Sequence, residues 1–147
     1  MNSIKAKAFC IFRSENKFLL SHGYDSSKNE HYLRPIRGSI EFGETSLQAI
    51  EREVFEEINQ QIIHTKFLGV LENLFSFNRQ QGHEIVFLYE ADFLDQKIYN
   101  QGEIKGHETD GSTYIAQWIT LEQLASGYPV YPKGIEHWLA ADRQPAF

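Results

Sequence analysis

The sequence predicts an α+β fold in which a mixed β-sheet is covered by helices on two sides. Segments rich in strand-forming residues occur before, between and after the helical segments, and several connections are short enough for hairpins. The clearest helical period lies between residues 46 and 58. With 147 residues the chain has the length of one ordinary domain. We therefore expect a single domain over residues 1–147.

The strand and loop assignments follow from composition. Strand-forming residues concentrate in several segments that alternate with polar, turn-forming segments. We expect strands at 6–13, 18–20, 32–34, 62–73, 84–93 and 114–119. We expect a turn at 14–16, a surface loop at 23–30, a hairpin turn or longer loop at 76–82, and helices at 120–124 and 135–141, the last packed through Trp138 and Leu139. Residues 94–111 are polar and give no clear assignment.

The helix at 46–58 has signals at both ends. Thr45 can cap its first turn while the Gln48 side chain reaches back to the main chain, which forms a capping box. Asn59 tolerates the left-handed conformation that commonly ends a helix. An apolar stripe at three- and four-residue steps is expected to face the core. This stripe consists of Leu47, Ile50, Val54 and Ile58.

Beside that stripe the helix carries three acids, Glu53, Glu56 and Glu57. Residues three and four apart share a helix face, so we expect the acids to look outward together at the edge of a groove, within an arc of about 100°. Like charges at this spacing destabilise a helix by roughly 0.2–0.5 kcal/mol per pair. A chain that keeps such a cluster beside a glycine-rich turn is expected to place a cation there.

The residues around the cluster resemble the signature of the Nudix hydrolases, G-x5-E-x7-R-E-U-x-E-E-x-G-U, in which U is a bulky aliphatic residue. Gly38 matches the first glycine, Glu44 the isolated glutamate and Arg52 the arginine, and the three acids follow in register. Asn59 and Gln60 depart from the usual glycine and aliphatic residue. Neither departure touches the carboxylates.

The resemblance implies the α/β/α sandwich of that family, with a mixed sheet between helices. It also implies hydrolysis of a nucleoside diphosphate linked to another group, with Mg²⁺ or Mn²⁺ as cofactor. Arg52 and Glu44 are expected to orient the catalytic glutamates, Glu53 and Glu56, through an ion pair. A homodimer is common in the family and stays open for this chain.

The chemistry of the acids supports the same cation. Hard divalent ions prefer oxygen ligands, and Mg²⁺ binds one or two carboxylates together with waters and substrate phosphates. Glu53 and Glu57 lie one turn apart and can bracket an ion, with Glu56 on the adjoining edge. The cation would then polarise phosphoryl oxygens and lower the pKa of an attacking water. The expected metal ligands are Gly38 (through its carbonyl), Glu53, Glu56 and Glu57, with Glu53 alternatively the general base.

Polar residues outside the helix are weaker candidates for substrate binding. Arg37, next to Gly38, is the best placed of three arginines to touch phosphate oxygens, the others being Arg34 and Arg79. Glu84 follows His83 at the start of an apolar strand, where the pair can face the groove. The alternative for the pair is an ordinary position at a strand end on the surface.

Two further groups of residues remain open. Many family members recruit an extra acid from a loop beyond the signature, and Glu108 is preferred here over Glu103 and Asp110, although solvated loop charges are the alternative. Phe75 and Phe77 can stack on a base, although core packing is the alternative. These phenylalanines occupy the stretch in which some subgroups carry a proline or tyrosine, which argues mildly against those subgroups.

Composition restricts the partners. The formal net charge is −6 without a basic run, so a nucleic-acid polymer is not expected, and a nucleotide-type small molecule is. No apolar run approaches the ~20 residues that span a bilayer, and the first residues do not have the pattern of a signal peptide. Cys10 is the single cysteine, which suits a cytoplasmic location.

Two classes of function remain open from the sequence. The first is a metal-dependent hydrolase of nucleotides or their derivatives, which the intact acids favour. The second is a nucleotide-binding or regulatory module with the same fold and no hydrolysis. The isomerase branch of the family is a distant third, because it would need a catalytic cysteine and Cys10 is poorly placed for it.

Overall fold

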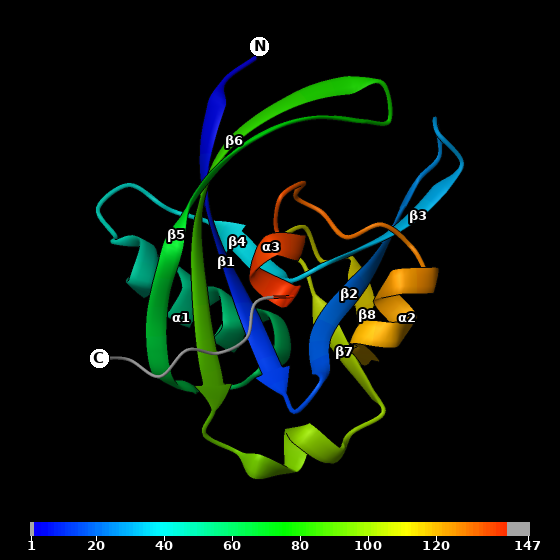
Figure 1. The fold of residues 1–147 in the computed structure, drawn as a ribbon. Helices are drawn as coiled ribbons and strands as arrows, with labels where there is room; N and C mark the ends of the chain where they lie inside the picture. The colour runs from blue at the N-terminus through cyan, green and yellow to red at the C-terminus, as the bar shows by residue number, and fades with distance from the viewer. Residues whose placement is uncertain (1, 141–147) are drawn as a thin grey trace.

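The structure is a computed structural model that describes residues 2–140, and its centre is a β-sheet of eight strands. The described residues also form three α-helices and one 3₁₀ helix (Figure 1). The strands are β1 (Ile4–Ser14), β2 (Lys17–Asp25), β3 (Glu30–Arg34), β4 (Ile36–Ser39), β5 (Ile62–Phe77), β6 (Gln80–Phe93), β7 (Glu103–His107) and β8 (Thr113–Thr120). The helices are α1 (Ser46–Ile58), α2 (Leu121–Ser126), α3 (Glu136–Ala140) and the 3₁₀ helix η1 (Gln96–Asn100).

The sheet mixes parallel and antiparallel pairs, in the order β5-β6-β1-β2-β8-β7, with β4 on β1 and β3 on β2. β1 runs parallel to β6 over most of its length and antiparallel to β4 on its other side. β2 pairs with β8 through its first half and with β3 through its second half. The mixed sheet with helices confirms the α+β fold class expected from the sequence.

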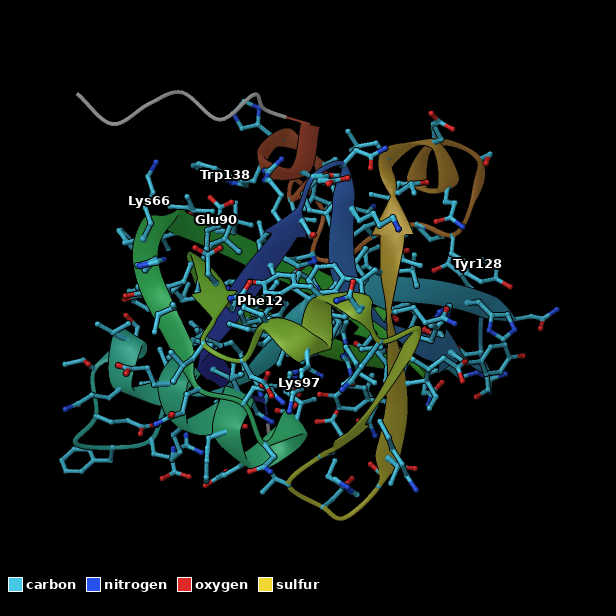
Figure 2. All side chains as sticks on the ribbon, turned by 90° about the horizontal axis from the view of Figure 1, so that it is seen from below. Phe12, Lys66, Glu90, Lys97, Tyr128 and Trp138 are labelled. Carbon is cyan, nitrogen blue, oxygen red and sulfur yellow. The ribbon has the colours of Figure 1, made fainter. Side chains whose placement is uncertain are left out.

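Two apolar layers enclose the sheet, and strand β1 contributes to both. Because successive side chains of a strand point to opposite faces, Cys10 and Phe12 belong to the cluster under α1, whereas Phe9 and Ile11 belong to the cluster under α3. Phe12 is fully buried at the centre of the molecule in Figure 2 and stacks on Phe93 at 3.9 Å between ring centroids. Helices therefore cover both faces, as expected.

The turn expected at 14–16 is present and joins β1 to β2 as a hairpin, but the surface loop expected at 23–30 is wrong. β2 continues to Asp25 and β3 begins at Glu30, so only residues 26–29 form a turn. Gly23 is inside β2, where it pairs with Tyr32 of β3, and the ring of Tyr32 lies across it in the space that a Cβ would need. Asp25 is 2% exposed and accepts the main-chain N–H groups of Ser27 and Lys28 at 2.9 and 3.2 Å. Cross-strand pairing thus overrides the polar composition of this segment.

The hairpin of strands β5 and β6 is longer than expected. Strands β5 and β6 extend to Phe77 and Gln80, and Asn78 and Arg79 form the turn between them with φ of 48° and 68°. Positive φ at both central residues is the requirement of a two-residue type I′ turn. Residues 94–111, left unassigned, contain η1 and β7, a polar edge strand that buries Ile104.

Helix α1 has the ends expected from the sequence. The capping box of Thr45 and Gln48 is present, and Asn59 ends the helix in the left-handed conformation with φ 55°. Thr120 caps α2 in the same way as Thr45 caps α1. The expected helix at 135–141 is present as α3, with Leu139 buried and Trp138 packed against the same cluster, while residue 141 lies outside the described residues. No helix within residues 2–140 is long and apolar enough to cross a bilayer.

Candidate active site

The site is built where strand β4 meets helix α1. Gly38 pairs with Ala8 of β1, and the Glu53 carboxyl group lies against the Gly38 α-carbon, in the space a Cβ would need. Glu53 is consequently only 3% exposed. The glycine of the sequence motif therefore has a steric reason, since any side chain at this position would displace the acid.

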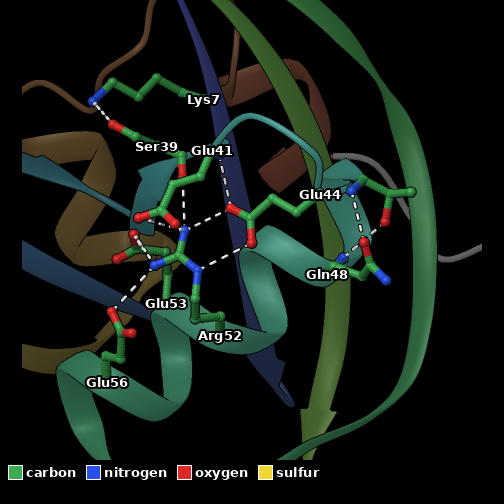
Figure 3. A network of polar contacts seen from close by, with 9 residues as sticks. Lys7, Ser39, Glu41, Glu44, Gln48, Arg52, Glu53 and Glu56 are labelled. Carbon is green, nitrogen blue, oxygen red and sulfur yellow. Dashed lines mark hydrogen bonds and ion pairs between the residues drawn. The ribbon is translucent and has the colours of Figure 1, made fainter.

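Arg52 connects the acids of the motif (Figure 3). Its guanidinium binds both oxygens of Glu44, at 2.7 Å from Nη2 and 3.1 Å from Nε, in the bidentate geometry that arginine forms with carboxylates. Its Nη1 donates to Glu53 at 2.8 Å and to Glu56 at 3.1 Å, and Nη2 also donates to the Ser39 carbonyl at 2.9 Å. The hydrogen bond to Glu44 contributes most to raising the arginine pKa, and the same bond lowers the Glu44 pKa. The expected Arg52–Glu44 ion pair is present.

Glu57 lies one helical turn beyond Glu53 and is 4% exposed. Its Oε1 accepts a hydrogen bond of 2.7 Å from the Tyr114 hydroxyl, and no arginine or lysine of the described residues forms an ion pair with it. Burial, together with Glu53, raises the pKa of the Glu57 carboxyl to about 9. Two adjacent buried acids without enough positive charge are the electrostatic arrangement that a bound cation relieves.

The three glutamates do not look outward together as expected. Glu53 and Glu57 belong to the buried face of α1, whereas the Glu56 side chain is 54% exposed and held by Arg52. The apolar stripe packs into the core cluster between α1 and the sheet, so the acids at its border become buried with it. The structure thus brings together Gly38, Glu53 and Glu57 and places Glu56 on the outer side of Arg52.

The comparisons with known proteins agree with this geometry. The family model of the NUDIX domain matches residues 2–139. The chain belongs to the NUDIX domain family. It is 31% identical over 113 residues to the NAD-capped RNA hydrolase NudC of Haemophilus influenzae (strain PittGG), a match covering 77% of this chain and 38% of that protein. The chain thus spans well under half the length of this curated relative.

Solved structures similar to this chain show the same NUDIX fold. The MutT protein from Bacillus halodurans has a TM-score of 0.62 at 17% identity, with 95% of this chain and 84% of that chain covered. A protein described as an ADP compounds hydrolase has a TM-score of 0.58 at 16% identity, with 85% and 62% covered. At such identities the likeness concerns the fold, the α+β sandwich that the sequence predicts.

Of the three loop acids considered in this NUDIX chain, Glu108 is the one beside the site. Its Oε1 lies 3.4 Å from Nη2 of Arg34, and its charge acts on the Glu57 carboxyl. Glu103 instead accepts a hydrogen bond from Gln117, and Asp110 accepts from Ser112 within its own turn. The structure therefore distinguishes these three acids, whereas their spacing in the sequence does not.

Arg34 and Arg37 lie close together between the acids and a neighbouring pocket. Burial lowers the pKa of Arg34, and the charge of Arg37 lowers it further. Arg37 packs over the Phe9 ring at 5.9 Å and forms no ion pair with any residue in 2–140. Two adjacent guanidinium groups with only one partner acid are suited to bind a phosphate. Arg79 lies in the β5–β6 turn, on the rim of a second hollow beside Glu84.

A pocket next to the arginines collects the remaining candidates. Glu84 is 8% exposed and lines it. Phe75 and Phe77 also line it, and each residue is 37% exposed, so neither is a core residue. His83 lines the adjoining hollow. Two other residues that line this pocket, Asn73 and Tyr131, are not predictable from the sequence. Asn73 lies in the middle of a strand, and Tyr131 is far along the chain from most of the other lining residues.

Tyr114, the hydroxyl partner of Glu57, was missed because an aromatic residue at the start of a strand gives only a packing signal. Its ring lies across Gly106, where a Cβ would clash. Cys10 is fully buried in β1 as a core residue, and burial raises the pKa of its thiol, so it is unsuited to nucleophilic chemistry.

Proposed function

We propose that this chain hydrolyses the diphosphate linkage of a nucleoside diphosphate joined to another group, with the help of Mg²⁺ or Mn²⁺. The observation that carries the proposal is the pair Glu53 and Glu57, two adjacent acids that are 3% and 4% exposed. Arg52 pairs with Glu53, but Glu57 has no ion pair among the described residues, so burying both carboxylates in ionised form is unfavourable unless a further cation is bound or Glu57 is protonated. Membership of the NUDIX family supports the first of these.

The residues fit a hard divalent cation. Glu53, Glu57 and the Gly38 carbonyl supply the oxygen ligands that Mg²⁺ and Mn²⁺ prefer. Among residues 2–140, no group of three acid, histidine or cysteine side chains closes around one point. Waters and substrate phosphates would therefore have to complete the coordination, as they usually do around Mg²⁺. When bound, the cation would polarise phosphoryl oxygens and lower the pKa of an attacking water.

The chain's own residues hold and orient these groups. Arg52 fixes Glu53 from one side, and Gly38 leaves room for it on the other. In this proposal Glu53 is a metal ligand or the general base, Glu57 a metal ligand held by Tyr114, and Glu56 a ligand only after it leaves Arg52. In the same proposal Glu108, which contacts Arg34, takes a proton or binds a further cation.

In this proposal Arg34 and Arg37 bind the phosphates of the substrate. Arg34 and Arg37 lie at the border between the acids and the aromatic pocket, so a diphosphate there has cations on both sides. This neutralisation is required because the acids would otherwise repel the substrate. The Haemophilus relative is named for NAD-capped RNA and a structural neighbour for ADP compounds, which brings NAD-linked and ADP-linked compounds into the test.

A phosphate-release screen tests the proposal. It would cover nucleoside triphosphates, sugar nucleotides, ADP-ribose, NAD and dinucleoside polyphosphates, with Mg²⁺, Mn²⁺ or EDTA. We expect turnover that EDTA abolishes and that Glu57→Gln lowers at least about 100-fold, the loss typical of a displaced catalytic group. Full turnover by Glu57→Gln would contradict the site assignment. Tight binding of one compound without cleavage of any would instead indicate a nucleotide-binding module.

A further inference from the structure

A pocket of about 210 Å³ lies between strands β3 and β4 and the far end of the β5–β6 hairpin. It is smaller than the roughly 300–1,000 Å³ of sites that bury a drug-sized ligand, so it has room for one ring system rather than a whole dinucleotide. Its walls are aromatic: Phe75, Phe77, Tyr32 and Tyr131 line it, and Tyr32 meets Phe77 edge to face at 6.2 Å. Such walls favour a flat heterocycle.

The rim of the pocket is a fixed structure. The turns of the β2–β3 and β5–β6 hairpins project from the same side of the molecule and touch (Figure 1). Lys28 donates to the Ser76 carbonyl at 2.7 Å, and the Ser26 main-chain N–H donates to the Asn78 side chain at 3.0 Å. Because the two hairpins hold each other, the aromatic walls are preorganised.

Glu84 is the polar group that this pocket leaves incompletely satisfied. The residue is 8% exposed, and its Oε1 accepts a long hydrogen bond of 3.3 Å from Nδ2 of Asn73. Its Oε2 has no hydrogen bond, and neither Lys7 nor Arg37 forms an ion pair with Glu84, among the described residues. Lys7 is engaged instead with Ser39 at 2.7 Å. A nearly buried carboxylate is thus available to a ligand that can donate hydrogen bonds.

We propose that this pocket binds a guanine base, with Glu84 as the residue that reads it and Asn73 as its neighbour. Oε2 and Oε1 of Glu84 are two adjacent acceptors, and Nδ2 of Asn73, next to Oε1, is a donor. Guanine carries the complementary series, because its 2-amino group and N1–H are adjacent donors and its O6 is an acceptor. Adenine, cytosine and uracil each lack two adjacent donors, and hypoxanthine lacks the 2-amino group.

The position of the pocket agrees with the proposed function, on which this inference rests. Arg34 and Arg37 line the pocket, and Arg34 also adjoins the site, since it contacts Glu108 and responds to the charge of Glu57. A base beside Glu84 therefore directs its phosphates past the arginines toward Glu53 and Glu57. The inference adds the base to a proposal that specifies only the diphosphate.

Calorimetric titration with GMP, IMP and AMP in EDTA tests the inference, because these ligands contain no diphosphate linkage and need no cation. We expect GMP to bind at least about tenfold more tightly than IMP or AMP, the ratio that one charge-assisted hydrogen bond supplies. Glu84→Gln should lower GMP affinity by about tenfold or more and bring the three ligands within about threefold of one another. Circular dichroism and the melting temperature would verify that the variant is folded.

Glu72→Gln is the matched control, because Glu72 is an exposed acid of β5, lies opposite Ile85 in the sheet and does not line the pocket. It should retain the preference for GMP. Equal affinities in the unmodified protein, absence of GMP binding, or an unchanged preference in Glu84→Gln would each overturn the inference. Diphosphate hydrolysis without base preference would sink this inference alone, whereas GMP preference without any hydrolysis would sink the proposed function alone.

Discussion

The Glu53 carboxyl group occupies the space that a side chain of Gly38 would fill. Gly38→Ala should therefore move Glu53 away from β4 without disturbing a hydrogen bond of the sheet. A displacement of about 1 Å at a catalytic group can lower the rate about 100-fold, and we expect a loss of this order in kcat/KM. Steady-state kinetics with Mg²⁺, together with the affinity for Mn²⁺, would measure it.

Gly102→Ala is the control for this prediction. A Cβ at Gly102 meets nothing within 4 Å, so its alanine variant should keep full activity. The melting temperature of both variants separates a local displacement from a loss of folded protein. Activity of Gly38→Ala equal to that of Gly102→Ala would show that the position of Glu53 does not matter for the reaction.

Tyr114 donates its hydroxyl proton to Oε1 of Glu57 at 2.7 Å. Partners that orient a metal ligand in this way typically contribute 10–100-fold to metal affinity, so Tyr114→Phe should weaken Mn²⁺ binding by about that factor. The ring still packs on Gly106, which keeps the fold. Tyr24→Phe removes an exposed hydroxyl bond to Asn29 and should leave metal affinity unchanged. Equal Mn²⁺ affinity in the two variants would exclude a positioning role for Tyr114.

Glu57 should give the metal-free protein a distinctive dependence on pH. Burial raises its pKa in the folded state to about 9 from the ordinary value of 4.5, so between these values the folded chain holds a proton that the unfolded chain releases. The free energy of unfolding therefore falls as pH rises through this window, by up to about 1.4 kcal/mol per pH unit. Denaturant titrations in EDTA at several pH values would measure the slope.

Glu57→Gln removes this titration and should flatten the slope relative to the unmodified protein. Saturating Mg²⁺ should do the same, because the cation binds the ionised carboxylates and stabilises the folded state at high pH. The comparison isolates Glu57 from the other titratable groups, because both proteins contain them. Parallel slopes for the two proteins in EDTA would mean that Glu57 is ionised without a cation.

Those parts of the fold that depend on local patterns could be predicted from the sequence. The α1 helix was predicted at both ends because Thr45, Gln48 and Asn59 act on the chain next to them. The extension of β2 through Gly23 is not predictable in this way, because it depends on pairing with β3, in which Gly23 lies opposite Tyr32. Strand β4 was missed for a similar reason: four residues between a proline and a polar loop become a strand only through pairing with β1.

The candidate site likewise contains residues that a local motif predicts and residues that only the tertiary structure brings in. The motif identifies Gly38, Glu44, Arg52 and the three acids, but only the packing of α1 shows which acids are buried and which is exposed. Tyr114 and Asn73 reach the site from other strands, and one sequence contains no signal for such contacts. Glu84 was a candidate from its place in a strand, and its partner Asn73 emerges from the β5–β6 register, in which the two residues are directly paired.

The three loop acids give a final prediction that sequence spacing could not make. Glu108 lies against Arg34 and acts on Glu57, whereas Asp110 is used by Ser112 and Glu103 by Gln117. A group that takes a proton in the reaction contributes typically 10²–10⁴-fold, so Glu108→Gln should lower kcat by at least about 100-fold if it is the base and by less if it binds a cation. The kcat of Glu103→Gln and of Asp110→Asn should stay within about twofold of that of the unmodified enzyme. A surface charge far from the reacting atoms has little effect on them, because water and salt screen it. The pH profile of kcat separates the two roles, since only a base removes the acidic limb when it is replaced. A large loss in Glu103→Gln or Asp110→Asn with full activity in Glu108→Gln would place the extra acid elsewhere in the loop.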